Sequence, residues 1–359
     1  MFSKLSTALL CMVSIFGGTV SSQNTTTGAS SLNQTFYKDV NVTRGLTYHY
    51  YFSPPSQGQP VLMFLHGFPS SSYDWHYQIE FFQNEGYGLI VPDMLGYAGT
   101  AKPVDPELYK SSLISQDMVD LLDAENVEEA IVVGHDWGSK IVARLANYFP
   151  ERFSAYGFVS VGYFPPSVFD ANMTEINNIT TQAIGYEIFG YWDFFSSDGA
   201  NELIESHLDS FYDLAFPNDT VLWITDFAPE GAMQAWLEAN RTTAAGDYIT
   251  PEASSTDTQI GLWRDEGLTG ALCWYKVVTS TIERDDDQGI PQENLTIKKP
   301  VFMGAALRDY VSIAASHIAR TLQVSENTTT IREYDAGHWA ILEAAAQLNS
   351  DLLAWIESL

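Results

Sequence analysis

Residues 130–138 read AIVVGHDWG, an apolar run that ends in two glycines on either side of a His-Asp-Trp segment. The frame Gly-x-Asp-x-Gly is typical of a sharp turn between a strand and a helix, and such a turn raises its central side chain, here Asp136, above the end of the strand. Gly134 and Gly138 permit the tight turn and the close approach of strand and helix. The next residues, SKIVARLANYF (139–149), have helical periodicity. A strand, a turn that presents a carboxylate and a helix are therefore predicted here.

Predicted strands and helices alternate on both sides of this turn. This pattern is typical of a mostly parallel sheet with helices on both faces. Between Pro165 and Pro291 the pattern changes to helix-like pieces that are crowded with aromatic residues. We therefore predict one α/β domain over 36–164 and 292–359, with a helical cap inserted at 165–291. The predicted strands are 47–52, 61–66, 88–93, 130–134, 155–161, 300–307 and 329–335, and the predicted core helices are 77–84, 112–124, 139–149 and 341–357.

The first 22 residues have the pattern of a secretory signal peptide. Lys4 precedes an apolar stretch that is shorter than the about 20 residues needed for a membrane span, and small residues follow it. Residues 23–35 are rich in Thr, Ser, Asn and Gly and are predicted to form a flexible leader. We therefore expect a secreted, extracellular protein without stable membrane insertion. Glycosylation is expected at several of nine N-x-Ser/Thr sequons: Asn24, Asn33, Asn41, Asn172, Asn178, Asn218, Asn240, Asn294 and Asn327.

The charge balance is strongly acidic, with 45 Asp and Glu residues against 17 Lys and Arg residues. A surface of this sign repels phosphate backbones and anionic lipids. The sequence therefore argues against nucleic acid or a membrane surface as a partner.

Three further motifs supply groups that the Asp136 turn would need for chemistry. HGFP (66–69) follows a predicted strand, and the backbone N–H groups of Phe68 and Trp137 are predicted to form an oxyanion hole. DAGHWA (335–340) follows the last predicted strand and contains His338, the best candidate for a general base. ALRDYV (306–311) follows the strand before it and supplies Asp309 to orient that base. The order Asp136, Asp309, His338 matches the order nucleophile, acid, base of α/β-hydrolases.

Asp136 stands where esterases and lipases have serine, and this difference changes the predicted chemistry. A carboxylate is already an anion at neutral pH, so it can displace a leaving group from an sp³ carbon and form an alkyl ester with the enzyme. His338 would then activate a water molecule that attacks the carbonyl carbon of this ester. Strained ethers and alkyl halides are the substrates that this chemistry predicts.

The sequence closely resembles the epoxide hydrolases of the α/β-hydrolase superfamily over nearly its whole length after the leader. One departure is Leu95, in a segment where the family often has an arginine, and no catalytic role falls on it. The motifs that carry the resemblance are HGFP with Trp75 downstream, DMLGYAGT (93–100), GHDWG, GYEIFGYW (185–192), GALCWYK (270–276), RDYV and AGHW.

This resemblance implies that Tyr275 and Tyr186 are the cap tyrosines that bind and protonate the epoxide oxygen. Tyr275 lies in the distinctive frame Gly-Ala-Leu-x-Trp-Tyr, whereas Tyr191, five residues after Tyr186, is an alternative for the second position. Trp75, Phe189 and Tyr191 are the candidates for lining the substrate pocket. The implied reaction joins a small apolar epoxide and water to give a vicinal diol, with no metal and no cofactor.

Two alternative functions are weighed against this one. A haloalkane or haloacid dehalogenase would use the same Asp136, Asp309 and His338. Haloalkane enzymes typically have Asn at the position of Phe68, and haloacid enzymes need arginines in the segment MLGYAGT (94–100), which contains none. A catalytically inactive member that binds a ligand is the other alternative, and the complete set of nucleophile, base, acid, oxyanion loop and tyrosines argues against it. The oligomeric state and the natural epoxide stay open.

Overall fold

The computed structural model describes residues 32–167, 172–249 and 256–359. The predicted signal peptide (1–22), residues 23–31 of the predicted leader and the sequon at Asn24 lie outside these residues. The described chain begins at Leu32, whose apolar side chain is buried against the core. A short 3-10 helix at Gln34–Phe36 follows, so the end of the predicted leader belongs to the core instead.

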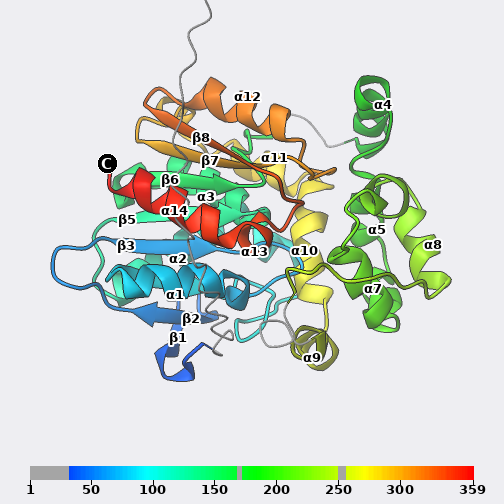
Figure 1. Ribbon diagram of the computed structural model, residues 1–359, viewed down its shortest axis with the longest axis horizontal. Coiled ribbons are helices and arrows are strands. Elements are labelled where there is room, and N and C mark those ends of the chain that lie inside the picture. The colour runs from blue at the N-terminus through cyan, green and yellow to red at the C-terminus, as the bar shows by residue number, and fades with distance from the viewer. Residues whose placement is uncertain (1–31, 168–171, 250–255) are drawn as a thin grey trace, which may run out of the picture.

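An eight-stranded sheet forms the centre of the molecule, with the strand order β1-β2-β4-β3-β5-β6-β7-β8 (Figure 1). The first two strands pair antiparallel with their neighbours, and the other pairs are parallel. All seven predicted strands are confirmed. The strand β1 was not predicted, because its polar and exposed residues give no apolar alternation. The strands are β1 (Tyr37–Asn41), β2 (Thr47–Ser53), β3 (Val61–Leu65), β4 (Gly88–Pro92), β5 (Ala130–His135), β6 (Phe153–Val159), β7 (Val301–Ala306) and β8 (Thr329–Tyr334).

Helices cover both faces of this sheet, as the alternation of the elements predicts. Successive residues of a strand point to opposite faces, so Leu62 and Phe64 pack under α1 and α14, while Met63 and Leu65 pack with α2 and α3. The fold is therefore the predicted α/β-hydrolase fold. The core helices are α1 (His76–Asn84), α2 (Ser111–Ala124), α3 (Trp137–Tyr148), α12 (Ala314–Val324), α13 (Ala340–Glu343) and α14 (Ala345–Ile356).

Between β6 and β7 the described chain forms only helices and connections, apart from the isolated β-bridges of Pro217 with Ala245 and of Ile297 with Ser325. Most of these helices lie beyond the ends of the parallel strands (Figure 1), whereas α11 lies against the core helix α2. They are α4 (Met173–Ile184), α5 (Gly190–Ser196), α6 (Ala200–Glu205), α7 (Leu208–Ala215), a π-helical turn (Trp223–Phe227), α8 (Ala232–Glu238), α9 (Thr256–Glu266), α10 (Thr269–Val278) and α11 (Ile282–Asp287). We call this set the cap.

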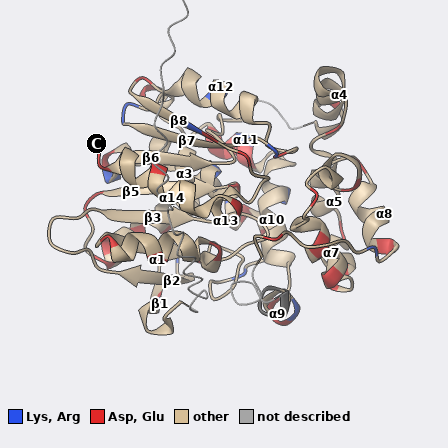
Figure 2. Ribbon diagram, viewed as in Figure 1, with Lys and Arg blue, Asp and Glu red and all other residues tan. Residues whose placement is uncertain are grey.

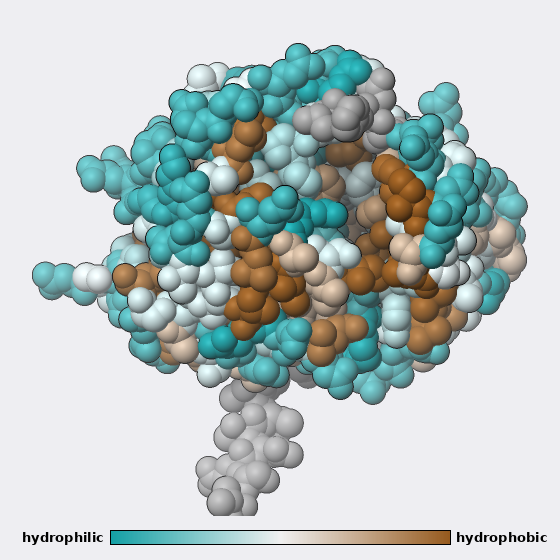
Figure 3. Space-filling model, turned by 90° about the horizontal axis from the view of Figure 1, so that it is seen from above, coloured by the Kyte–Doolittle hydropathy of each residue, from teal (hydrophilic) through white to brown (hydrophobic). Residues whose placement is uncertain are grey.

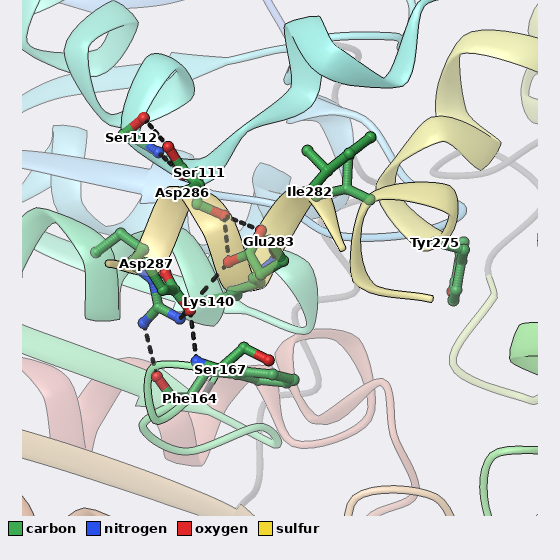
Figure 4. A network of polar contacts seen from close by, with 12 residues as sticks. Ser111, Ser112, Lys140, Phe164, Ser167, Tyr275, Ile282, Glu283, Asp286 and Asp287 are labelled. Atoms are coloured by element: carbon green, nitrogen blue, oxygen red, sulfur yellow. Dashed lines mark hydrogen bonds and ion pairs between the residues drawn. The ribbon is translucent and has the colours of Figure 1, made fainter. Parts of the chain in front are cut away.

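A buried network of charges attaches the cap to α3 (Figure 4). Lys140 Nζ lies 2.9 Å from Glu283 Oε2, and Arg144 binds Asp287 through two nitrogens at 2.6 and 2.7 Å. All four side chains are at most 5% exposed. The Arg144 guanidinium also donates to the carbonyl of Phe164 at 2.8 Å, so one cation binds both the segment that leads into the cap and the helix that leads out of it.

Acidic residues are spread over both the core and the cap, for example on α7 (Figure 2). None of the described helices is both long and apolar enough to cross a bilayer.

Candidate active site

The turn after β5 holds Asp136 in a conformation that few side chains adopt. Its φ is 54° and its ψ is −123°, and such strained backbone is often found at functional sites. A Cβ on Gly134 would lie 2.4 Å from the carbonyl carbon of Gly138, and a Cβ on Gly138 would lie 2.0 Å from the Leu65 carbonyl oxygen. Glycine is thus required at both positions because the strand and the helix nearly touch, and the predicted turn is confirmed.

Two backbone N–H groups hold one side of the Asp136 carboxylate. Phe68 N–H donates to Asp136 Oδ1 at 2.8 Å, and Trp137 N–H also hydrogen-bonds to the carboxylate. A Cβ on Gly67 would come within 2.2 Å of Oδ1, so only glycine allows this approach. The two donors predicted for an oxyanion hole therefore face the carboxylate that would become the ester carbonyl.

His66 holds the loop that carries Phe68. Burial lowers the pKa of His66 to about 4, so the ring is neutral at neutral pH. Its Nε2 accepts a hydrogen bond from the Met94 N–H at 2.8 Å, and its Nδ1 donates to the Gly67 carbonyl at 2.9 Å. This histidine is therefore structural.

His338 lies between the two aspartates that the sequence assigns to the site. Its Nδ1 is 2.7 Å from Asp309 Oδ2, and its Nε2 is 3.5 Å from Asp136 Oδ2. Asp309 is fixed in turn, because its Oδ1 accepts hydrogen bonds from the N–H groups of Val311 and Ser312 at 2.9 Å each. The three side chains therefore form the arrangement of nucleophile, base and orienting acid.

Burial and mutual attraction act against each other in this group. Burial alone would lower the pKa of His338, but the charges of Asp309 and Asp136 and the hydrogen bond to Asp309 raise it above its usual value. Burial would raise the pKa of Asp309, but His338 and the two N–H donors hold it below its usual value. Burial raises the pKa of Asp136, although His338 and the two N–H donors oppose this. Asp309 is thus the more firmly ionised of the two carboxylates.

Two cap tyrosines lie over Asp136, and they are Tyr191 and Tyr275. Both line the same narrow space as Asp136 and His338, and their ring centroids are 6.0 Å apart. Burial, together with the charge of Asp136, raises the pKa of both hydroxyl groups. Both hydroxyls therefore stay protonated at neutral pH and are available as proton donors.

The structure corrects the prediction for Tyr186. This side chain is only half-buried, and its hydroxyl donates to the backbone carbonyl of Tyr310 at 2.8 Å. It therefore joins the cap to the loop that carries Asp309 and does not line the narrow space over Asp136. Tyr191 is on the first turn of α5 and takes the position that was assigned to Tyr186.

The prediction that Trp75 lines the substrate pocket is also wrong. Trp75 ends a 3-10 turn (Ser72–Trp75) and is fully buried among the residues that pack on the α1 face of the sheet. Its ring stacks on Phe64 at 4.9 Å between centroids. The side chain therefore stabilises the core and lines neither the narrow space over Asp136 nor the larger cavity beside it.

A cavity of about 810 Å³ leads away from Asp136 between the core and the cap. Figure 3 looks onto the side of α12 and α4 and shows hydrophobic residues gathered around a depression between them. Phe189 and Tyr191 line it, as predicted for the pocket. Other apolar residues in its wall include Trp137, Val161, Ile176, Ile188 and Trp192.

Two aromatic residues near His338 were not singled out from the sequence. Trp223 and Phe227 lie in the π-helical turn of the cap, stack on each other at 4.6 Å, and line the space with Asp136. The ring of Trp223 is 5.2 Å from that of His338. No local motif marks them, because only the folding of the cap brings this turn over the base.

Among the described residues, no group of three or more His, Cys, Asp or Glu side chains is arranged to hold a metal ion.

Residues 60–345 match the family model described as alpha/beta hydrolase fold, so the chain belongs to that family. It is 26% identical over 315 residues to "Bifunctional epoxide hydrolase 2" of Sus scrofa, covering 83% of this chain and 52% of the relative. It is 27% identical over 312 residues to "Epoxide hydrolase" of Caballeronia sordidicola, covering 83% of this chain and 88% of that protein.

A solved structure entitled "Epoxide hydrolase from an endophytic Streptomyces" superposes on 89% of this chain and 95% of its own, with a TM-score of 0.72 and 26% identity. The chain spans about half the length of the mammalian relatives that it matches.

Proposed function

We propose that this protein is an epoxide hydrolase, which adds water to an epoxide and releases a vicinal diol. One observation carries the proposal: the Asp136 carboxylate has its Oδ1 held by two backbone N–H groups, while its Oδ2 faces His338 below the cap tyrosines. A serine hydrolase has no use for two phenol donors opposite its nucleophile. An epoxide needs them, because the oxygen that leaves carbon must receive a proton.

In the first step, Oδ2 of Asp136 attacks one carbon of the epoxide and the bond from that carbon to the ring oxygen breaks. Tyr191 or Tyr275 gives its proton to the departing oxygen, which leaves a hydroxyalkyl ester on Asp136 and a phenolate. The anion so formed lies next to the partner phenol, which can stabilise it by a hydrogen bond.

In the second step, His338 takes a proton from water, and the hydroxide attacks the ester carbonyl carbon. The charge that develops on Oδ1 is stabilised by the N–H groups of Phe68 and Trp137. The tetrahedral intermediate expels the diol oxygen, which takes the proton of His338. The proton left on the Asp136 carboxyl returns to the tyrosine, so the sum is epoxide plus water to diol.

Intact-mass spectrometry of the His338→Gln variant tests this mechanism. Treatment with a reactive epoxide should add the mass of one epoxide to this variant, because the ester forms and is not hydrolysed. The double variant Asp136→Ala with His338→Gln should add nothing. No added mass on the single variant, while the wild type forms diol, would contradict the ester mechanism.

The dehalogenase alternative is tested in the same preparation by halide release from chloroalkanes. Phe68 occupies the position where an amide would bind halide, and its N–H is already engaged by Asp136. We therefore expect diol from epoxides and no halide. Halide release that depends on Asp136, without diol, would favour the dehalogenase.

We also propose that the protein is secreted and glycosylated, and that residues 165–291 form the cap as one inserted unit. We infer that a signal peptide directs the chain out of the cell and that glycans are attached at exposed sequons. Support comes from the side chains of Asn33, Asn41, Asn172, Asn178, Asn218, Asn240 and Asn327, which are all exposed. Asn294 is only partly exposed, and its Nδ2 donates to the Asn147 carbonyl at 2.9 Å. Peptide mass mapping of the secreted protein should find no glycan at Asn294 and a new N-terminus near Ser22.

A further inference from the structure

An ion pair joins the loop that carries Asp309 to the loop that carries His338. Arg308 precedes Asp309 in the chain, and its Nη2 lies 3.2 Å from Oε2 of Glu343, the last residue of α13. The same guanidinium contacts Asp335 twice, with Nε 2.9 Å from Oδ1 and Nη2 3.0 Å from the carbonyl oxygen. The residue next to the orienting acid is therefore attached to the segment that precedes the base.

Glu343 also binds the backbone directly before the base. Both of its carboxylate oxygens accept the Gly337 N–H, Oε1 at 2.9 Å and Oε2 at 3.0 Å. A Cβ on Gly337 would lie 2.7 Å from Glu343 Oε1, so glycine allows this approach. The Glu343 side chain is 11% exposed, whereas that of Arg308 is 42% exposed. A mostly buried carboxylate thus holds the peptide before His338, and a half-exposed cation holds the carboxylate.

The peptide after the base is held by uncharged donors. The His338 carbonyl accepts hydrogen bonds from His135 Nε2 and from Ser160 Oγ, each at 2.8 Å. Burial lowers the pKa of His135 to about 3, so this imidazole is neutral at neutral pH. The backbone of His338 is therefore fixed on both sides, and the side held by Glu343 brings a charge to it.

Glu343 acts on His338 as a third carboxylate. Burial lowers the pKa of the His338 imidazole, whereas the charges of Asp309, Asp136 and, with a smaller effect, Glu343 raise it. Loss of the Glu343 charge should therefore make His338 easier to deprotonate. Two further imidazoles near this ring are neutral at neutral pH, because burial lowers the pKa of each: His135 to about 3 and His317 to about 4.

Opposing effects act on the Glu343 carboxylate itself. Burial raises its pKa, and the charge of Asp309 adds to this rise. The backbone hydrogen bond, the Arg308 guanidinium and His338 lower it. The phenol of Tyr248 also lies nearby and stays protonated, because burial raises its pKa well above the usual value. Arg308 is thus the permanent cation that favours the ionised form of Glu343.

We propose that Glu343, together with Arg308, is a positioning residue for His338: the pair fixes the base against Asp309 and makes ester hydrolysis depend on the Glu343 charge. This inference rests on the proposed function, because it concerns the second step of the same reaction. Neither Glu343 nor Arg308 lines the cavity or the narrow space over Asp136. Ester formation, the first step, should therefore not depend on the pair.

Single-turnover kinetics with a reactive epoxide measures the two steps separately across pH. Glu343→Gln keeps an acceptor for the Gly337 N–H and removes the charge, whereas Glu343→Ala removes both. In both variants ester formation should change by less than about twofold. The midpoint of the pH profile for ester hydrolysis should fall by about half a pH unit or more, because an anion favours the protonated imidazole. At high pH hydrolysis should slow by about tenfold in Glu343→Ala, and Glu343→Gln should recover part of this loss.

Three further variants are the controls. Arg308→Gln loosens the link between the loops but keeps the Glu343 carboxyl group, so hydrolysis should slow while the midpoint does not fall. Asp351→Asn and Arg332→Gln make the same changes in net charge within a surface ion pair, and both should leave the two steps as in the wild type. An unchanged midpoint in Glu343→Gln, or equal slowing of both steps, would overturn the positioning role.

A measurement on the protein without substrate separates this inference from the proposed function. The His338 imidazole can be titrated by NMR, and its signal is the one that is absent from His338→Gln. A lower pKa of His338 in Glu343→Gln than in the wild type would support the inference, even if no epoxide were hydrolysed. Hydrolysis of epoxides with an unchanged pKa of His338 would retain the proposed function and reject the role of Glu343.

Discussion

Two buried groups of ionisable side chains lie against helix α3. The candidate active site lies just before its first residue, and the charge network lies along its length. In the network of Lys140, Arg144, Glu283 and Asp287, each carboxylate lies 2.6 to 2.9 Å from a cation. In the site there are two carboxylates and a histidine but no permanent cation. Asp136 Oδ2 has its nearest charged neighbour at 3.5 Å, and this side chain is 18% exposed.

Burial of charge has a different consequence in each of the two groups. Taking a charge out of water is unfavourable in both, and only partners compensate for it. Where the partners are complete, the charges hold the two ends of the cap on α3. Where they are incomplete, one carboxylate keeps an oxygen free to react. If the two groups are separable, loss of the network affects stability and loss of the site affects chemistry.

Replacement of Asp136 by alanine should have the largest effect. Removal of the proposed nucleophile should lower kcat for diol formation by roughly ten-thousand-fold or more, as loss of a catalytic nucleophile does elsewhere. The melting temperature should stay the same or rise, because a partly desolvated carboxylate in a strained turn is removed. Steady-state kinetics and thermal unfolding check the two parts. A large loss of stability would show that the site also holds the fold together.

Replacement of Arg144 by methionine should affect mainly stability. Asp287 would be left buried without its cation, which costs about 3–5 kcal/mol when one partner of a buried pair is removed. Denaturant unfolding measures this change in the free energy of unfolding. Arg332→Met is the matched control, because it breaks a surface pair with Asp351 that should contribute about 0–1 kcal/mol. Equal effects of both variants would contradict the role of the network as an anchor.

The same contrast explains how far the sequence predicts this molecule. The strands and the Asp136 turn have local signals, namely apolar runs and glycines at fixed spacing, and the triad residues each follow a strand whose end lies at the same edge of the sheet. The charge network has no such signal, because Arg144 and Asp287 are 143 residues apart.

The errors in the site have equally physical causes. Tyr186 and Tyr191 belong to one aromatic segment, and only the start of α5 at Gly190 decides which of them turns toward Asp136. Trp75 follows the oxyanion loop in sequence, yet the 3-10 turn at 72–75 sends its ring to the other face of the sheet.

The tyrosine correction predicts a smaller effect that discriminates between the two residues. Tyr191→Phe should slow ester formation by about 100-fold. This is the low end of the range for loss of a general acid, because Tyr275 remains as a proton donor. Tyr186→Phe should change the rate by less than about threefold and should cost about 1 kcal/mol of stability, the worth of its hydrogen bond to Tyr310. Single-turnover kinetics on the two variants is the measurement. A larger rate loss in Tyr186→Phe would restore the assignment made from the sequence.

The smallest expected effect is a pH dependence that belongs to the site and not to the network. The pKa of His338 in the folded protein is raised by Asp309 and Asp136 against the effect of burial. In the unfolded chain it is about 6.5. A raised pKa stabilises the folded state fully below the unfolded value, and this contribution is lost as pH rises through the folded value.

The free energy of unfolding of wild type minus that of His338→Gln should therefore fall as pH rises above about 6.5. Over the same range the rate of ester hydrolysis should rise, because only neutral His338 can accept a proton from water. Denaturant unfolding and single-turnover measurements across this range give both curves. A difference in stability that rises with pH would mean that burial lowers the pKa of His338 by more than the two aspartates raise it. In the charge network, by contrast, every buried charge has a partner of opposite sign.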